Sequence, residues 1–187
     1  MTAGSRSNMP PPAPRTPFTI RLETPADYRA VYEVNRVAFE QKQEADLVEQ
    51  LRQAPGHIPE LSLVASAGTQ VVGHVLFSPV AIQTAEKTVP ALALAPIAVL
   101  PAYQRRGVGS QLIRVGLESA RHLGHRSVIV LGHPDFYARF GFVPASAKDI
   151  RCPFPAPDEA FMVCELVAGA LAGVYGTVQY PAAFFDV

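Results

Sequence analysis

The sequence contains two cysteines, no tryptophan and no excess of charge of either sign. Cys152 and Cys164 lack metal-ligand spacing and cannot form a disulfide framework, so they predict reduced thiols, a cytoplasmic protein and no metal site. Sixteen Lys and Arg residues balance sixteen Asp and Glu residues, so the net charge provides no general attraction to nucleic acid. No apolar run reaches the roughly 18 residues of a membrane span. We therefore expect neither nucleic acid nor a membrane as a partner.

The composition divides the chain into three parts. Its 187 residues are enough for one domain with a sizeable core. Residues 1–17 are rich in proline and lack an apolar block, which excludes a signal peptide and predicts a disordered tail. Residues 18–168 carry the apolar periodicities of a folded domain. Residues 169–187 are rich in glycine but still apolar, so we expect them to pack on the domain or on a second subunit, which leaves a homodimer open.

The stretch from Ala95 to Ser110 carries the clearest functional signal. It begins inside an apolar run of strand length, Leu92–Val99, passes through a basic turn and continues into an amphipathic helical pattern. The first N–H groups of a helix lack intrahelical partners and lie at the positive end of the helix dipole, so they attract anions. Gly107 and Gly109 let a phosphate approach the backbone without a Cβ in the way. The turn therefore predicts a phosphate site, although it lacks the ending of a P-loop and the length of a dinucleotide fingerprint.

Two motifs resemble those of the GNAT family of N-acetyltransferases. Gln104-Arg105-Arg106-Gly107-Val108-Gly109 is similar to the Gln/Arg-x-x-Gly-x-Gly/Ala loop with which that family binds the pyrophosphate of acyl-CoA. Tyr137-Ala138-Arg139-Phe140-Gly141-Phe142 is similar to the family's Tyr-x-x-x-Gly-Phe. With Leu131-Gly132-His133-Pro134 and Arg151-Cys152-Pro153-Phe154-Pro155, these motifs resemble the YhbS-like branch of the family.

The order of the expected elements agrees with this resemblance. From Phe18 to about Val167, the patterns predict a strand, two helices, three strands, a helix, a strand, a short helix and two strands. The fold class is therefore α/β. The resemblance implies the GNAT acyl-CoA N-acyltransferase fold, a mixed, splayed sheet flanked by helices. Pro96 stands in the strand before the basic turn, and because proline has no N–H, it predicts a local break in strand pairing.

The resemblance also implies acetyl-CoA as the acyl donor and assigns its contacts. The pyrophosphate is expected on Gln104, Arg105, Arg106, Gly107, Val108, Gly109 and Ser110. The pantetheine arm is expected to pair with the backbone of Ile97, Ala98 and Val99 like an added strand, with one N–H facing the thioester oxygen. Tyr137 is the expected catalytic acid, because a neutral phenol with a pKa of roughly 10 can give a proton to the leaving thiolate.

The acceptor side is less defined. The resemblance places acceptor contacts near Glu40 and Glu44, and His74 and His133 are further candidates for the base that deprotonates the amine. A structural or solvated role stays open for each of the four. The wider family often carries Asn ahead of the short helix, where this sequence has Gly132-His133-Pro134.

These features predict an N-acetyltransferase that moves an acetyl group from acetyl-CoA to a primary amine of a small molecule or peptide. The transfer is expected to be direct, in a ternary complex. The alternative is a non-catalytic acyl-CoA-binding sensor or scaffold on the same fold.

Overall fold

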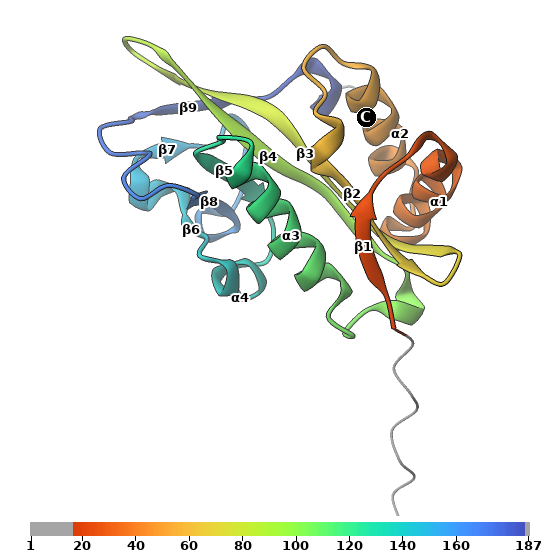
Figure 1. Ribbon diagram of the computed structural model, residues 1–187. Coiled ribbons are helices and arrows are strands. Elements are labelled where there is room, and N and C mark those ends of the chain that lie inside the picture. The colour runs from red at the N-terminus through yellow and green to blue at the C-terminus, as the bar shows by residue number, and fades with distance from the viewer. Residues whose placement is uncertain (1–16, 186–187) are drawn as a thin grey trace, which may run out of the picture.

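A mixed β-sheet with helices on both faces forms the frame of the molecule (Figure 1). The computed structural model describes residues 17–185, so the tail predicted for residues 1–17 lies almost wholly outside the described residues. The α-helices are α1 (Tyr28–Phe39), α2 (Gln43–Gln53), α3 (Val108–His122) and α4 (Pro134–Tyr137). The strands are β1 (Thr19–Leu22), β2 (Ser62–Ala67), β3 (Gln70–Thr84), β4 (Thr88–Val99), β5 (Ser127–Leu131), β6 (Val143–Pro144), β7 (Ile150–Arg151), β8 (Phe161–Glu165) and β9 (Gly176–Gln179).

The strands follow the order β1-β2-β3-β4-β5-β8-β6, with β9 paired to β3 and β7 paired to β9. The pairs are antiparallel except for β4–β5 and β7–β9, which are parallel. The α/β class, the mixed sheet and the predicted order of elements are therefore confirmed. β7 and β9 are additional strands that the sequence patterns did not identify, and β9 brings the C-terminal segment into the same sheet.

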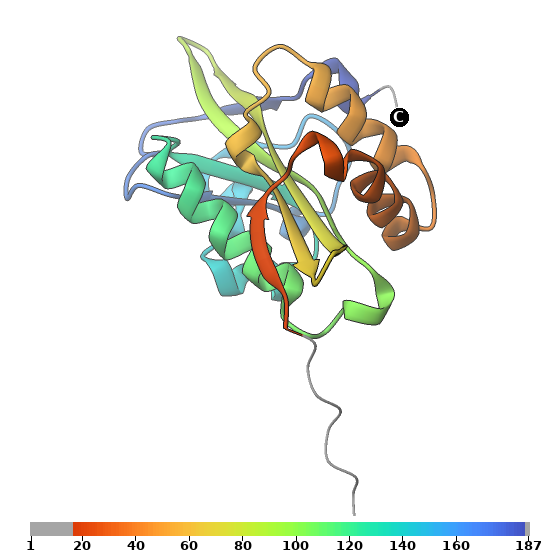
Figure 2. The same cartoon turned by 45° about the vertical axis from the view of Figure 1, so that its right-hand side comes forward.

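The helices are divided between the two faces of the sheet. In Figures 1 and 2, α1 and α2 lie on one face and α3 lies on the other. Neighbouring side chains of a strand point to opposite faces, so Leu63 packs in the same cluster as Leu112 of α3. Val64, the next residue of β2, instead packs in the same cluster as Val31 of α1. Within residues 17–185, no helix is both long and apolar enough to cross a membrane.

β4 and β5 pair with each other over a short distance only. Leu92 lies opposite Val128, and Ala93 lies opposite Ile129. Beyond Ala93, the edge of β4 that faces away from β3 has no strand partner within the part of the chain that the structure describes. The sheet is therefore open between these two strands in the direction of their carboxyl ends.

An irregularity in β4 accompanies this opening. The pairs Phe77–Leu94 and Val75–Ile97 are two residues apart on β3 but three residues apart on β4. The extra residue makes a bulge in β4 at the position of Pro96, which has no N–H to donate to a neighbour. The break in pairing predicted at Pro96 is confirmed.

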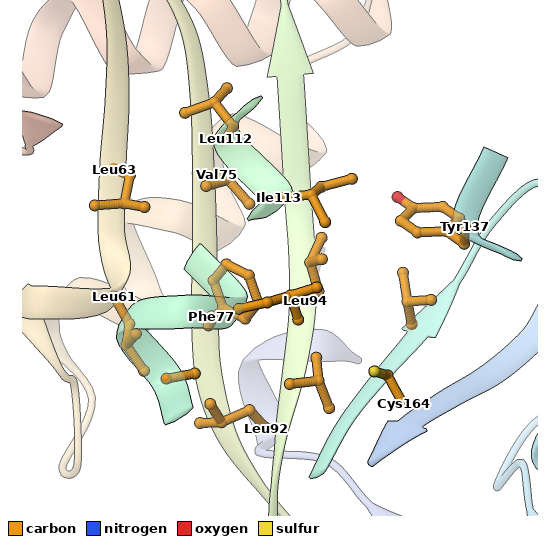
Figure 3. Packing of buried hydrophobic residues seen from close by; sticks show 14 of the residues in the cluster. Leu61, Leu63, Val75, Phe77, Leu92, Leu94, Leu112, Ile113, Tyr137 and Cys164 are labelled. Carbon is orange, nitrogen blue, oxygen red and sulfur yellow. The ribbon is translucent and has the colours of Figure 1, made fainter. Parts of the chain in front are cut away.

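The core under α3 is tightly packed around Phe77, a fully buried residue of β3 (Figure 3). Gly116 of α3 lies directly over this ring, because a Cβ built on Gly116 would overlap the Cε2 and Cζ atoms of Phe77. A larger residue at position 116 would therefore push the helix away from the sheet.

We expect Gly116→Ala to lower the free energy of unfolding by about 1–3 kcal/mol through overpacking. This loss would occur although alanine is the better helix former by about 1 kcal/mol. Urea unfolding measures the change. Ser119→Ala on the same helix is the matched control and should change stability by less than about 0.5 kcal/mol. A Gly116→Ala variant as stable as the wild type would contradict this packing.

Candidate active site

The turn that joins β4 to α3 presents backbone donors. Gly107 has a φ of 88°, a left-handed conformation that favours glycine, and it forms the N-cap of α3. The N–H of Gln111 donates to the Gly107 carbonyl oxygen at 3.0 Å. The N–H groups of residues 108–110 precede this bond, so they have no intrahelical acceptor and lie at the positive end of the helix dipole. This arrangement suits an anion.

Space for such an anion exists beside the turn. A Cβ built on Gly107 would meet no heavy atom within 4 Å. A Cβ on Gly109 would lie 3.7 Å from Cγ2 of Val99, 3.8 Å from Cδ1 of Ile97 and 3.8 Å from Cζ of Phe136. Gly109 is thus the point at which the first turn of α3, the end of β4 and α4 meet.

The polar side chains of the turn have different surroundings. Gln104 donates from Nε2 to the carbonyl oxygen of Val99 at 3.0 Å, so its side chain ties the turn to the end of β4. Arg105 and Arg106 are exposed. Neither forms an ion pair with any residue between 17 and 185, and Arg106 stacks 5.5 Å from the ring centre of Tyr103.

The strand residues predicted to bind pantetheine lie on the open part of β4. Ile97, Ala98 and Val99 pair with β3 on one side, and on the other side they have no strand partner among residues 17–185. Unpaired backbone groups at a strand edge are available to a ligand that extends alongside them. The structure thus brings this segment and the turn together.

Tyr137 lies in α4 with its ring packed closely against Gly132, where a Cβ would collide with the ring. Phe136 and Phe142 pack edge-on to it, with ring centres 5.1 and 5.6 Å away. Only 6% of Tyr137 is exposed, and burial raises its pKa to about 12. Its hydroxyl makes no hydrogen bond to a described residue, and in Figure 3 it is directed toward β4. The phenol is therefore neutral at physiological pH and free to donate.

The predicted acceptor residues do not gather around Tyr137. Glu40 is exposed at the end of α1, and Glu44 accepts a hydrogen bond from Gln41 Nε2 at 3.0 Å. His133 is exposed at the N-cap of α4. No hydrogen bond joins any of these side chains to Tyr137 within residues 17–185, so the geometry singles out no general base.

His74, a candidate for the base that deprotonates the amine, is buried between α1 and the sheet. It is 0% exposed, and its Nδ1 lies 3.2 Å from Nδ2 of Asn35 while its Nε2 lies 3.1 Å from Oγ of Ser62. Burial, with a smaller effect of Arg52, lowers its pKa to about 3. A neutral histidine enclosed in this way is not available to a substrate, so the geometry does not support His74 as a substrate contact.

The contacts of His74 belong to a buried network of hydrogen-bonded polar side chains, which the sequence patterns did not indicate. Ser62 donates to Glu23 at 2.6 Å, and Glu23 is paired with Arg52 of α2 at 2.6 Å. If Ser62 donates to Glu23, it accepts from His74 Nε2, and His74 Nδ1 accepts from Asn35. This network links α1 and α2, the two helices of one face, to β2 and β3. It fixes the strand that lies beside the open segment of β4.

A separate cavity of about 660 Å³ lies beside β7 and the start of β8. Its lining includes Asp149, Arg151, Phe154, Phe161 and Tyr175. None of the predicted cofactor residues lines it. Within residues 17–185, no group of three or more His, Cys, Asp or Glu side chains is placed to hold a metal ion.

In this mixed sheet two neighbouring strands, β4 and β5, separate toward their carboxyl ends, and a helix starts after the first of them. This is the architecture of the acyl-CoA N-acyltransferase class. Residues 19–145 match the acetyltransferase (GNAT) domain family. The chain therefore belongs to the GNAT family of N-acetyltransferases, as its motifs predicted.

Relatives within the family support the same branch. The chain is 40% identical over 162 residues to the uncharacterized N-acetyltransferase YhbS of Escherichia coli K12. The matched region covers 86% of this chain and 95% of YhbS. It is also 40% identical over 143 residues to the uncharacterized N-acetyltransferase YjhQ of the same organism, covering 76% of this chain and 79% of that protein. The resemblance to the YhbS-like branch is confirmed.

Two solved structures are similar over most of their length. The crystal structure of E. coli YhbS in complex with CoA has a TM-score of 0.85 at 38% identity, covering 95% of this chain and 96% of that one. The structure of a GNAT family acetyltransferase from Brucella melitensis in complex with acetyl-CoA has a TM-score of 0.71 at 35% identity, covering 90% and 99%.

The burial of His74 predicts a pH dependence of stability. Its pKa is about 3 in the folded protein and 6.5 for a free side chain, so between these values the unfolded chain binds more protons. Stability should therefore fall as the pH drops from 6.5 toward 3, by about 1.4 kcal/mol per pH unit from this group. His74→Gln should remove that slope, measured by urea unfolding across the pH range. His122→Gln, at a side chain that is 74% exposed, is the control. Equal slopes in the wild type and His74→Gln would contradict the assignment.

Proposed function

We propose that this protein transfers an acetyl group from acetyl-CoA to a primary amine, directly and in a ternary complex. The observation that carries the proposal is the meeting of three features at Gly109: the N-terminus of α3, the open segment of β4 and α4 with Tyr137. The relatives bound to CoA and acetyl-CoA support the choice of donor.

The residues of this chain would hold the donor at two places. The N–H groups of residues 108–110 would bind the pyrophosphate, helped by the charges of Arg105 and Arg106. The backbone of Ile97–Val99 would pair with the pantetheine arm along the open edge of β4 and offer an N–H to the thioester oxygen. Bound there, acetyl-CoA supplies an activated acyl group.

Tyr137 would act as the acid. Its raised pKa keeps Oη protonated, and this proton can pass to the thiolate as the C–S bond breaks. The acceptor amine forms the new C–N bond and loses a proton to a base that the geometry does not single out.

The cysteines support direct transfer over an acyl-enzyme. Burial raises the pKa of both Cys152 and Cys164, which lowers the fraction of reactive thiolate at neutral pH. Both thiols are free, which also supports a cytoplasmic location.

One observation favours a second function, the binding of acyl-CoA without turnover. No hydrogen bond joins the side chains of Glu40, Glu44 or His133 to Tyr137 among the described residues, so a complete acid–base pair is not apparent there. Release of free CoA in the presence of an amine distinguishes the two functions.

The test combines binding and turnover. Acetyl-CoA at 100 times its Kd should stabilise the fold by about 2.7 kcal/mol, measured as a shift in Tm. A panel of small amines and peptides, with a thiol reagent to detect CoA, should then identify an acceptor. Binding without release for any amine would support the sensor, and the absence of any stabilisation would contradict both functions.

Tyr137→Phe should reduce kcat by about 100-fold or more, because the ring stays in place while the donated proton is lost. Stability and the Kd for CoA should change little, since the hydroxyl makes no hydrogen bond within the described residues. Steady-state kinetics and thermal unfolding measure both. Tyr175→Phe, at a residue that is 64% exposed, is the control. Near-wild-type turnover in Tyr137→Phe would mean that another group supplies the proton.

A further inference from the structure

Arg114 of α3 and Arg139 after α4 are held against aromatic rings, and neither has a carboxylate partner among the described residues. Arg139, which follows α4, lies 4.7 Å from the ring centre of Phe136 and 5.5 Å from that of Phe140. Arg114 of α3 lies 5.2 Å from the same Phe140 ring. Neither arginine forms an ion pair with another residue in the range 17–185. The two guanidinium groups therefore share one ring and leave their charges uncompensated.

The stacking leaves most of their donors available. A guanidinium group that packs its face on a ring keeps its N–H groups in the plane, where they can bind the oxygens of a phosphate in pairs. Arg139 uses Nε to donate to the carbonyl oxygen of Phe136 at 3.2 Å, which fixes the group and leaves its terminal nitrogens free. The nearby carboxylate in the sequence, Asp135, is exposed and forms no ion pair with either arginine. The two arginines therefore present N–H donors of the kind that bind a phosphate.

The position of this pair relates it to the turn before α3. Phe136, on which Arg139 stacks, reaches to 3.8 Å from the β-position of Gly109. Arg114 lies six residues after the start of α3 at Val108, about 9 Å along the helix axis, and helical side chains lean toward the N-terminus. A ligand with one anionic group at the turn and a second anionic group one sugar away could therefore reach both the turn and the two arginines.

CoA has this pattern of charge, because its adenosine carries a phosphate monoester on the 3′ oxygen, one ribose away from the pyrophosphate. We propose that Arg114 and Arg139 form the subsite for the 3′-phosphate of CoA. The inference rests on the proposed function, which places the pyrophosphate at residues 108–110. It assigns to the two arginines a role in choosing CoA over the same molecule without the 3′-phosphate.

The test is a cycle of protein and ligand changes measured by titration calorimetry at one fixed salt concentration. The ligands are CoA and 3′-dephospho-CoA, and the proteins are the wild type, Arg114→Gln, Arg139→Gln and the double variant. The wild type should bind CoA about tenfold or more tightly than dephospho-CoA, the scale of charge-assisted hydrogen bonds. The double variant should bind both ligands equally, with the affinity for dephospho-CoA within about twofold of the wild-type value.

Arg126→Gln is the matched control. Arg126 is an exposed arginine at the amino end of β5, the end opposite to α4, and it forms no ion pair with the described residues. It should keep the wild-type discrimination, and thermal unfolding should show that all variants are folded. Loss of discrimination in Arg126→Gln would attribute the effect to long-range charge and overturn the subsite.

The remaining outcomes separate this inference from the proposed function. Equal binding of the two ligands by the wild type would overturn the subsite and leave CoA binding intact. An equal loss of affinity for both ligands in the arginine variants would mean that the arginines act through packing, which also overturns it. Binding of neither ligand by the wild type would contradict the proposed function itself.

Discussion

The loss of pairing between β4 and β5 is the constraint on which the site depends. These strands pair only at Leu92–Val128 and Ala93–Ile129, and a bulge at Pro96 follows on β4. A strand edge inside a protein is costly unless its N–H and C=O groups find partners. An extended, amide-containing ligand can supply them, and a helix N-terminus lies at the end of the same strand to hold the ligand's charge. The buried network of polar side chains that runs from Asn35 through His74 and Ser62 to Arg52 keeps this opening in place.

The sequence allowed the fold and the glycine-bearing turn before α3 to be predicted because their causes are local. Pro96 lacks an N–H whatever surrounds it, and Gly107 suits the left-handed conformation that the N-cap of α3 adopts. His74 could not be placed, because its burial depends on Asn35 and Ser62, which lie 39 and 12 residues away in the sequence. β9 has four residues and no clear alternation, and its pairing with β3 joins residues that are about half the length of the chain apart. The same limit applies to Arg114, whose stacking on Phe140 depends on how α3 and the segment after α4 pack.

Although the net charge is balanced, cations on the two faces of the sheet have different surroundings. On the face of α1 and α2, the cation Arg52 is compensated by Glu23 and Glu49 and serves to hold the helices to the sheet. Around the N-terminus of α3, Arg105 and Arg106 have no such partners in the described residues. Cations that gather at one place without carboxylate partners create a local positive potential, which favours an anionic ligand. A local surplus can therefore indicate an anionic ligand in a chain with no net charge.

The central claim is that acyl-CoA binds along the open edge of β4 and at the first turn of α3. Titration of the ¹⁵N-labelled protein with CoA, followed by the backbone amide signals, tests it most directly. The largest changes should occur at Ile97–Val99 and Val108–Ser110, with little change in β1 and β2. Unchanged signals at both segments, with the largest changes instead among residues such as Arg151 and Phe154 that line the separate cavity, would contradict the account.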